Sequence, residues 1–289
     1  TVTGGDNVGG LVGDNFGTIT NASVSGSVTG GERFVGGLAG FSTENITTAT
    51  FSGSVTSTDF VGGLVGINTG NVTDATISVS VTATGEFGAA GGLAAENNGN
   101  ITDAAASGNV TGTDDVGGLV GRNFVSLTDA SASVNVTGTD NVGGLVGSNN
   151  GVDENNGTIQ NASASGSVTG ENNVGGLVGR NFESITDSSA SGSVNGTDEA
   201  GGLVGDNFAN ITDSFAVGPV SGESGTVGGL VGSTGFDDSG ITQQSYFDTQ
   251  TTGQTTSAGN AAGLTTAQMQ GESARTNMSG LDFDNTWTT

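Results

Sequence analysis

The chain repeats the hexapeptide Val8-Gly9-Gly10-Leu11-Val12-Gly13, with small changes, nine times along its 289 residues. The copies begin at Val8, Val35, Val61, Ala90, Val116, Val142, Val174, Ala200 and Val227, so most are 26 or 27 residues apart. A fixed period of about 20–50 residues is typical of solenoids, in which each unit buries its apolar face only against its neighbours. The repeat therefore predicts one elongated body rather than a fold around a single pocket.

Each repeat contains three stretches with the character of short β-strands. Residues 22–28 alternate apolar or small residues with hydroxyl residues, which predicts a strand with one buried and one wet face. The hexapeptide is the second predicted strand, and the Ile-Thr-Asx-Ala stretch at residues 19–22 is the third. The prediction is an all-β fold, a right-handed parallel β-helix (β-solenoid) of about nine coils of 26–27 residues with a C-terminal cap.

Stacked coils place equivalent residues above one another, so two columns are expected, one of leucines in the core and one of asparagines at a corner of the coil. The leucine of the hexapeptide should form a core column of Leu11, Leu38, Leu64, Leu93, Leu119, Leu145, Leu177, Leu203 and Leu230. An asparagine follows in seven repeats, at Asn15, Asn68, Asn97, Asn123, Asn149, Asn181 and Asn207. Because an amide both donates and accepts hydrogen bonds, these side chains should form a ladder along the axis.

The two valines of the hexapeptide allow two interpretations. Strict alternation with an inward Leu11 would turn Val8 and Val12 outward, and nine coils would then present an apolar ribbon for lateral contacts. Alternatively, the Gly9-Gly10 pair forms a bulge that turns both valines inward.

The C-terminal part departs from the repeat. It holds the only Tyr, the only Trp and both Met residues, and large side chains suit a cap over the last coil. We therefore divide the chain into a repeat solenoid at 1–245 and a capping segment at 246–289. Residues 265–277 are expected to form a short helix with Thr265 or Thr266 as N-cap. The first residues match the end of a repeat, so the chain is expected to open in mid-coil, through either processing or a cut.

The charge of the chain restricts its partners. The net charge is −25, with 29 acidic residues against four basic ones, which excludes nucleic acid as a natural partner and disfavours anionic lipid surfaces. Such an acidic, lysine-free chain is typical of halophiles, since salt screens its self-repulsion. There is no cysteine and no apolar run long enough for a membrane span, so no membrane insertion of this segment is expected.

Acidic residues recur at one position of the Ile-Thr-Asx stretch. Like charges about 4.8 Å apart repel by about 0.9 kcal/mol in water, and molar salt removes most of that repulsion. A solvated acidic face is the simplest interpretation, and weak binding of Ca²⁺ or other divalent cations is the alternative. The residues concerned are Asp74, Asp103, Asp129, Asp187 and Asp213. No other cofactor is expected.

Asn-x-Ser/Thr sequons also recur, and some are expected to carry glycans if the chain is displayed on a cell surface. Part of their number follows from composition and from the repeat itself. The candidates are Asn21, Asn45, Asn71, Asn100, Asn135, Asn161 and Asn210.

Catalysis is not expected. The chain has no His, Lys or Cys, which removes most general bases and nucleophiles. Arg122 and Arg180 share one repeat position, and we expect them to pair with nearby acids. An acid pair acting on a polysaccharide is the outlying alternative, because carboxylates are plentiful.

The pattern V-G-G-L-V-G-x-N followed by I-T-x-A-x-x-S-G-x-V-x-G resembles the GLUG repeat of bacterial and archaeal cell-surface proteins and adhesins. The resemblance covers roughly residues 5–245 and implies an extracellular, non-catalytic module. Partners would be the protein itself, another surface protein or a glycan. We expect a structural or adhesive β-solenoid module of a halophile's surface, with the sequons above as sites for glycans. The alternative is a self-assembling subunit of an extracellular filament, joined head to tail or laterally.

Overall fold

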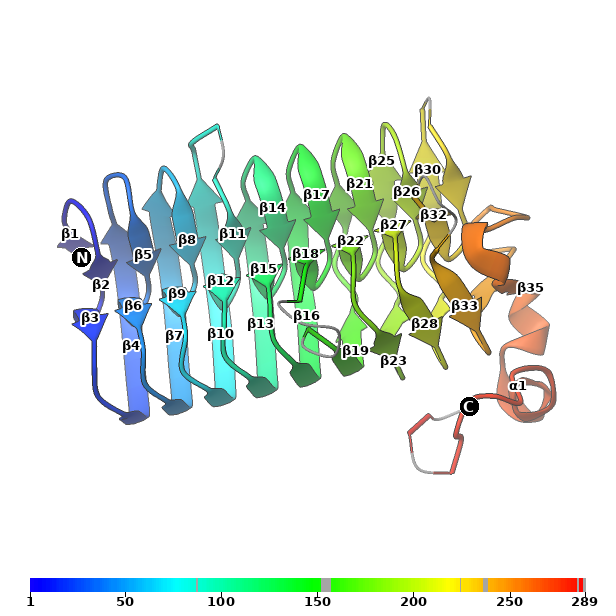
Figure 1. Cartoon of the computed structure of the whole chain (residues 1–289), viewed down its shortest axis with the longest axis horizontal. Helices are drawn as coiled ribbons and strands as arrows, with labels where there is room; N and C mark the ends of the chain where they lie inside the picture. The colour runs from blue at the N-terminus through cyan, green and yellow to red at the C-terminus, as the bar shows by residue number, and fades with distance from the viewer. Residues whose placement is uncertain (87, 152–156, 224, 236–238, 285, 288–289) are drawn as a thin grey trace.

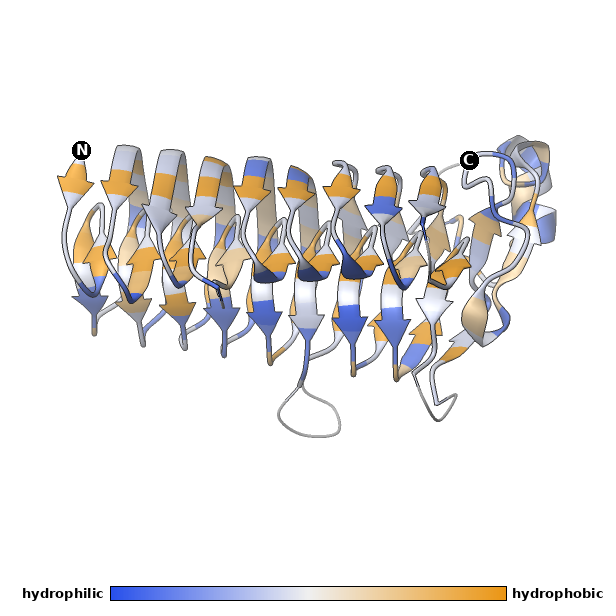
Figure 2. Cartoon of the chain, turned by 90° about the horizontal axis from the view of Figure 1, so that it is seen from above, coloured by the Kyte–Doolittle hydropathy of each residue, from blue (hydrophilic) through white to orange (hydrophobic). Residues whose placement is uncertain are grey.

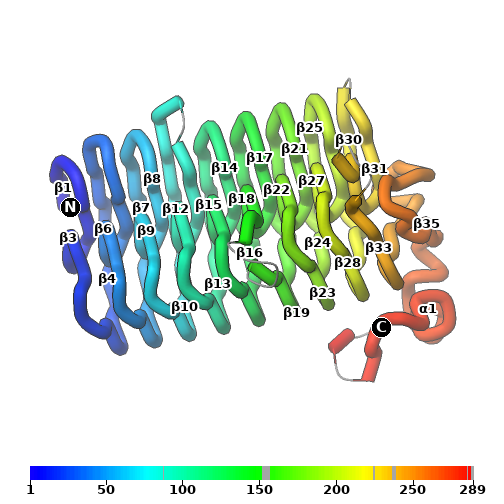
Figure 3. The backbone as a smooth tube through the Cα atoms, in the orientation of Figure 1, coloured from blue at the N-terminus to red at the C-terminus, as the bar shows by residue number. Residues whose placement is uncertain are grey.

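A computed structural model shows a rod of stacked coils, described for residues 1–86, 88–151, 157–223, 225–235, 239–284 and 286–287. The coils follow one another from the N-terminal end to a C-terminal cap (Figures 1 and 3). All strand pairs within the three sheets are parallel, and each pairs the same repeat positions of consecutive coils. The predicted right-handed parallel β-helix of about nine coils is confirmed.

Sheets B and C each contain nine strands, one from each coil. Sheet B comprises β2 (Val8–Gly9), β5 (Phe34–Gly36), β8 (Phe60–Gly62), β11 (Ala90–Gly91), β14 (Asp114–Gly117), β17 (Asp140–Gly143), β21 (Asn172–Gly175), β26 (Ala200–Gly201) and β31 (Val227–Gly228). Sheet C comprises β3 (Val12–Asn15), β6 (Ala39–Ser42), β9 (Val65–Asn68), β12 (Ala94–Asn97), β15 (Val120–Asn123), β18 (Val146–Asn149), β22 (Val178–Asn181), β27 (Val204–Asn207) and β32 (Val231–Ser233).

Sheet A holds the remaining strands, and its strands are long in the first five coils and short afterwards. The long strands follow β1 (Val2–Thr3) and are β4 (Ile19–Thr29), β7 (Ile46–Ser57), β10 (Val72–Ala83), β13 (Ile101–Thr111) and β16 (Leu127–Thr137). The short ones are β19 (Ile159–Ala164), β20 (Val168–Thr169), β23 (Ile185–Thr186), β24 (Ser189–Ala190), β25 (Val194–Gly196), β28 (Asn210–Thr212), β29 (Phe215–Ala216), β30 (Val220–Gly222), β33 (Ile241–Gln243), β34 (Tyr246–Asp248) and β35 (Ala262–Leu264).

This strand assignment corrects the sequence prediction. The hexapeptide is not one strand: it bends at Gly10 and Leu11, so that one half joins sheet B and the other joins sheet C. The two other predicted strands merge into one long strand of sheet A in coils 1 to 5. We call the bend and its two flanking strands the B–C corner.

Glycine makes the B–C corner possible. A Cβ on Gly147 would lie 2.5 Å from the carbonyl carbon of Asp115 and 2.6 Å from the backbone nitrogen of Val116, so the sheet B and sheet C backbones nearly touch. A Cβ on Gly118, at the bend, would meet the carbonyl oxygen of Gly144 at 2.0 Å. Such close approaches strongly favour glycine, and coil 4 alone has a larger residue, Ala95, at the Gly147 position.

The bend settles the orientation of the valines. Val116 and Val120 are both fully buried, as are their equivalents in most coils, so the outward valine ribbon is wrong and the inward alternative is confirmed. The reason is that the tight corner reverses the alternation between the two halves of the hexapeptide. Apolar segments therefore recur at the same place in successive coils (Figure 2).

The leucine column is confirmed from Leu38 to Leu230, where each leucine is fully buried. Leu11 is the exception, with 58% of its surface exposed, because only one neighbouring coil packs against it. The asparagine ladder is also confirmed. Hydrogen bonds of 2.8–3.0 Å run from each amide nitrogen to the next amide oxygen through Asn68, Asn97, Asn123, Asn149, Asn181 and Asn207.

The ladder has one defect in coil 2, where Ser42 replaces asparagine. Asn15 donates to the Ser42 hydroxyl, but Ser42 donates to the carbonyl oxygen of Glu44. The Oδ1 atom of Asn68 is buried and has no hydrogen-bond partner among the described residues. The ladder is therefore continuous only from Asn68 onward.

The C-terminal segment covers the last coil. Phe247 joins the main core against Gly229, while the Gly229 amide donates to Thr256 O and the Val231 amide to the Ser257 hydroxyl. A second small cluster contains Tyr246, Ala274, Met278 and Leu281. These contacts occupy strand edges that would otherwise stay open.

The single helix predicted for 265–277 is wrong in its continuity. The segment contains a short 3₁₀ helix, η2 (Thr266–Gln268), followed by an α-helix, α1 (Gly271–Asn277). Another 3₁₀ helix, η1 (Ala258–Asn260), precedes the segment. Thr265 forms the predicted N-cap, in a capping box with Gln268. Gly271 has a φ of 57°, which interrupts helical geometry between η2 and α1. No helix among the described residues is long and apolar enough to cross a membrane.

Candidate functional site

The outer side of the B–C corner carries ion pairs. Arg122 Nε bonds to the carboxylate of Asp115, and its Nη2 lies 4.0 Å from Asp114 Oδ2. Arg180 Nε lies 3.8 Å from Asp206 Oδ2. The prediction that both arginines pair with nearby acids is confirmed, so these carboxylates are held by cations.

Burial raises the pKa of two carboxyl groups at this corner. Desolvation is the main cause for Asp114, where Asp115 also raises the pKa and Arg122 lowers it. Desolvation is again the main cause for Glu199, with the charges of Asp198 and Asp206 adding to it. The corner therefore concentrates negative charge near each arginine.

Arg180 also contacts an aromatic pair that the sequence analysis did not single out. The rings of Phe182 and Phe208, from consecutive coils, stack with centroids 4.7 Å apart and planes 8° apart. The Arg180 guanidinium lies 4.8 Å and 5.1 Å from the two centroids, within cation–π range. The available signal was the Asn-Phe dipeptide at Asn181 and Asn207, since equal repeat positions in adjacent coils must touch.

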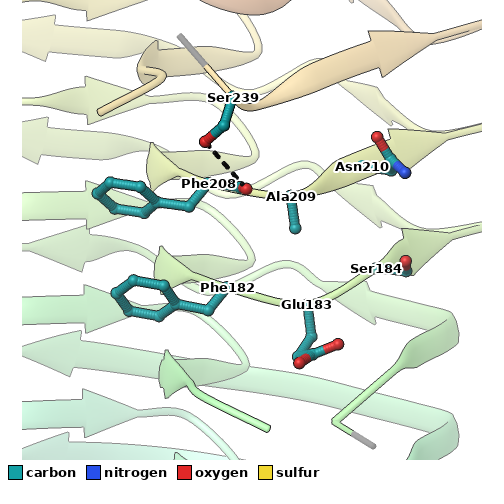
Figure 4. Close-up of a pocket in the computed structure, with 7 residues that line it drawn as sticks. All are labelled: Phe182, Glu183, Ser184, Phe208, Ala209, Asn210 and Ser239. Atoms are coloured by element: carbon teal, nitrogen blue, oxygen red, sulfur yellow. Dashed lines mark hydrogen bonds between the residues drawn. The ribbon is translucent and has the colours of Figure 1, made fainter. Parts of the chain in front are cut away.

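A pocket of about 400 Å³ lies beside this aromatic pair. Figure 4 shows the two rings at one side, Ser184 and Asn210 at the other, and Glu183 and Ala209 between them. Ser239 closes a further side, and its hydroxyl donates to Phe208 O at 3.2 Å. We call this the Phe182–Asn210 pocket. Its volume falls in the range of about 300–1,000 Å³ that is typical of ligand pockets.

The predicted divalent-cation residues do not lie on a flat strand. Each occupies a bend with left-handed backbone geometry, φ 49–56°, and the sheet A register skips it. Asx residues tolerate that geometry better than other non-glycine residues, which explains why Asp recurs there. The residues are Asp74, Asp103, Asp129, Asp187 and Asp213.

Three pairs of these aspartates lie on consecutive coils: Asp74 with Asp103, Asp103 with Asp129, and Asp187 with Asp213. Desolvation raises the pKa of Asp213, with the charge of Asp187 as a further cause. Within the described part of the chain, no group of three or more His, Cys, Asp or Glu side chains is arranged to hold a metal ion. Weak divalent binding at pairs of aspartates stays a prediction.

All seven candidate glycosylation asparagines are exposed: Asn21, Asn45, Asn71, Asn100, Asn135, Asn161 and Asn210. Their surroundings differ. Asn161 donates to Asp129 and Asn135 donates to Asn109, whereas Asn210 lines the Phe182–Asn210 pocket. Exposure meets the first requirement for modification, and the modification itself stays a prediction.

Comparison with known proteins agrees with the repeat. Residues 170–195 match the family model described as the GLUG motif. Halomucin from Haloquadratum walsbyi (strain DSM 16790 / HBSQ001) is 49% identical over 70 residues, which cover 23% of this chain and 1% of halomucin. No solved structure gives a significant match. The resemblance to GLUG-repeat surface proteins of halophiles is confirmed, and the aligned segment spans only a small part of halomucin.

Proposed function

We propose that this chain, built from GLUG repeats, is a non-catalytic structural and adhesive module on the surface of a halophile. The observation that supports this most is the uninterrupted stack. Sheets B and C run through nine coils in register, and the asparagine ladder joins six consecutive coils internally. A stack whose coils each depend on their neighbours forms an elongated body that suits a spacer between a cell and its surroundings.

The charge supports display in brine. At 1 M ionic strength the Debye length is about 3 Å, so most repulsion within a chain of net charge −25 is screened. In dilute buffer the same surface repels itself. The charge therefore suits a saline environment, and the similarity to GLUG-repeat surface proteins supports an extracellular location.

Sheet A supplies a polar face for adhesion. Hydroxyl groups bond from coil to coil along its outer side, as between Thr50 and Ser23 at 2.9 Å and between Ser54 and Ser27 at 3.1 Å. A face of ordered hydroxyl groups suits a polar partner, and we propose a glycan or protein of another surface. The ion pairs of Arg122 and Arg180 support a non-catalytic role, because their acids are engaged.

A second candidate is a self-assembling filament subunit. Coil 1 favours it, since Leu11 is 58% and Phe16 is 72% exposed there. Lateral assembly through a valine ribbon is excluded, because those valines are buried. Association through coil 1 is the remaining route.

Light scattering of the purified chain in roughly 2–3 M KCl separates the two candidates, since charges are fully screened there. The surface-module proposal predicts a monomer of 27.9 kDa in brine. Defined oligomers or fibres would contradict it and support the filament subunit. The Leu11→Ser variant is the control, because it would dissolve oligomers formed through coil 1 and leave a monomer unchanged.

A further inference from the structure

Asn210 shares its repeat position with three other sequon asparagines, Asn45, Asn71 and Asn100, but not their surroundings. Those three lie on consecutive coils. The Asn71 amide N–H donates to Asn45 Oδ1 at 3.0 Å, and Asn100 Nδ2 donates to Asn71 Oδ1 at 3.2 Å. Glycans on adjacent coils would be only about 4.8 Å apart at their roots, so these sites crowd one another.

No sequon asparagine occupies the same repeat position as Asn210 on either neighbouring coil. In register it lies opposite Ile241 on one side, and Ser184 precedes the Ile185 that pairs with Ile211 on the other. Within the range of residues that the structure describes, no side-chain hydrogen bond holds its amide. Asn210 is exposed, and no second sequon asparagine on a neighbouring coil crowds it.

The residue two positions earlier also differs. It is Thr43, Thr69 or Asn98 for the three crowded sites, and it is Phe208 for Asn210. Phe208 and Phe182 cover each other's faces, and Gly235 lies against the Phe208 ring, so the pair presents ring edges and the partly exposed Phe182 to the pocket. The Phe182–Asn210 pocket thus has an apolar wall opposite a polar one (Figure 4).

We propose that Asn210 carries an N-linked glycan and that its first sugar packs in the Phe182–Asn210 pocket. A pyranose ring has apolar C–H groups that can make van der Waals contacts with the phenylalanine rings, and hydroxyl groups that suit Ser184 and Glu183. The pocket volume of about 400 Å³ is sufficient for one monosaccharide, with the rest of the glycan directed to solvent. The glycan would then be part of the packed surface of coils 7 and 8.

The modification needs a glycosyl donor with a phosphate leaving group. The bond between the sugar C1 and the phosphate oxygen breaks, and a bond between C1 and Asn210 Nδ2 forms. The amide nitrogen gives up one proton to a base of the transferase, and the phosphate departs with the bonding electron pair, so nothing is oxidised or reduced. Thr212 completes the sequon. The inference rests on the proposed surface location, since it requires an exported chain to meet such a donor.

The first test is site occupancy. The chain is produced with an export signal in a halophilic host that has its own N-glycosylation, and peptides from the surface fraction are measured by mass spectrometry. We expect a glycan on Asn210 and higher occupancy there than at Asn71. A surface chain with a bare Asn210 overturns the inference alone. A chain that stays inside the cell despite its export signal contradicts the proposed function as well.

The second test is whether the sugar is seated in the pocket. The Tm of the glycosylated chain is compared with that of Asn210→Gln, in the wild-type background and in Phe182→Ser. We expect the glycan to raise Tm by about 2–4 °C in the wild type and by much less in Phe182→Ser. Because each comparison stays within one background, destabilisation by Phe182→Ser itself does not matter. An equal rise in Tm in both backgrounds, or no rise in the wild type, contradicts packing of the sugar in the Phe182–Asn210 pocket. Asn100→Gln is the matched control and should show no such dependence on Phe182.

Discussion

The B–C corner and sheet A are parts of the same coils, yet they tolerate variation very differently. In the corner, a glycine pair and a leucine recur in every coil, and the leucine is buried in all coils but the first. In sheet A, one strand of 11 or 12 residues spans each of coils 1 to 5, but coils 7 and 8 use three short pieces. Sheet A holds valine at positions 79 and 134 where most other coils have glycine.

The difference shows where the fold is constrained. Corner glycines face backbone atoms of a neighbouring strand, so larger residues are disfavoured there, and Ala95 in coil 4 is the one replacement. In sheet A the inward side chains change size between coils, from Phe51 and Ile77 to Ala106 and Ala132. The corner therefore fixes how successive coils stack, whereas sheet A tolerates side chains of different size.

The largest expected effect is the loss of a corner leucine. Leu119→Ala should lower the free energy of unfolding by about 2–5 kcal/mol, because Leu119 is fully buried and its removal leaves a cavity. Leu11→Ala is the matched control and should cost far less, since Leu11 is mostly exposed. Denaturant unfolding in brine measures both. Equal losses would mean that coil 1 is packed like the central coils.

The next effect tests the close approach of the two sheets. Gly147→Ala should destabilise by about 1–3 kcal/mol, because its Cβ would overlap the Asp115 and Val116 backbone. Gly17→Ala is the control, since a Cβ there meets nothing within 4 Å. Ala95 occupies the Gly147 position in coil 4, where Ala90 and Ala94 replace the flanking valines. A neutral Gly147→Ala variant would show that the corner can widen to hold a methyl group without loss of stability.

The next two effects concern the asparagine ladder. Asn149→Ala breaks two buried bonds and should cost about 1–3 kcal/mol. Ser42→Asn should have the opposite sign and stabilise by about 0.5–1.5 kcal/mol, because its Nδ2 would reach the unpaired Asn68 Oδ1. Thermal unfolding of both variants checks this pair. A destabilised Ser42→Asn would show that coil 2 cannot hold the larger amide.

The smallest effect is a pH dependence in sheet A. The folded state raises the pKa of Asp213, so it favours the protonated form more than the unfolded chain does. The associated stability is present at pH below about 4 and is lost as pH rises through the folded pKa. Asp213→Asn should therefore gain stability over the wild type as pH rises across that window. The reverse trend in unfolding curves would show that Asp213 is stabilised by a cation or donor.

Much of this architecture could be predicted because equal repeat positions stack on each other. That rule alone gave the leucine column and the ladder through Asn97 and Asn123. It did not give the bend at Gly10, because a Gly-Gly pair is compatible with a strand bulge or a full corner. It also missed the left-handed bend at Asp103, since local Asx geometry resembles a strand in sequence. The Phe182–Asn210 pocket escaped prediction because it depends on side chains of two coils and on Ser239 from a third.

Hydrogen exchange in brine tests most directly whether the B–C corner holds the rod together. The Leu177 amide, which donates to Leu203 O at 2.8 Å, should exchange through unfolding of the stack and be among the slowest amides. The Ser191 amide, in the broken part of sheet A of the same coil, should exchange faster through local opening. Slower exchange at Ser191 than at Leu177 would contradict this account and assign the stability of the rod to sheet A.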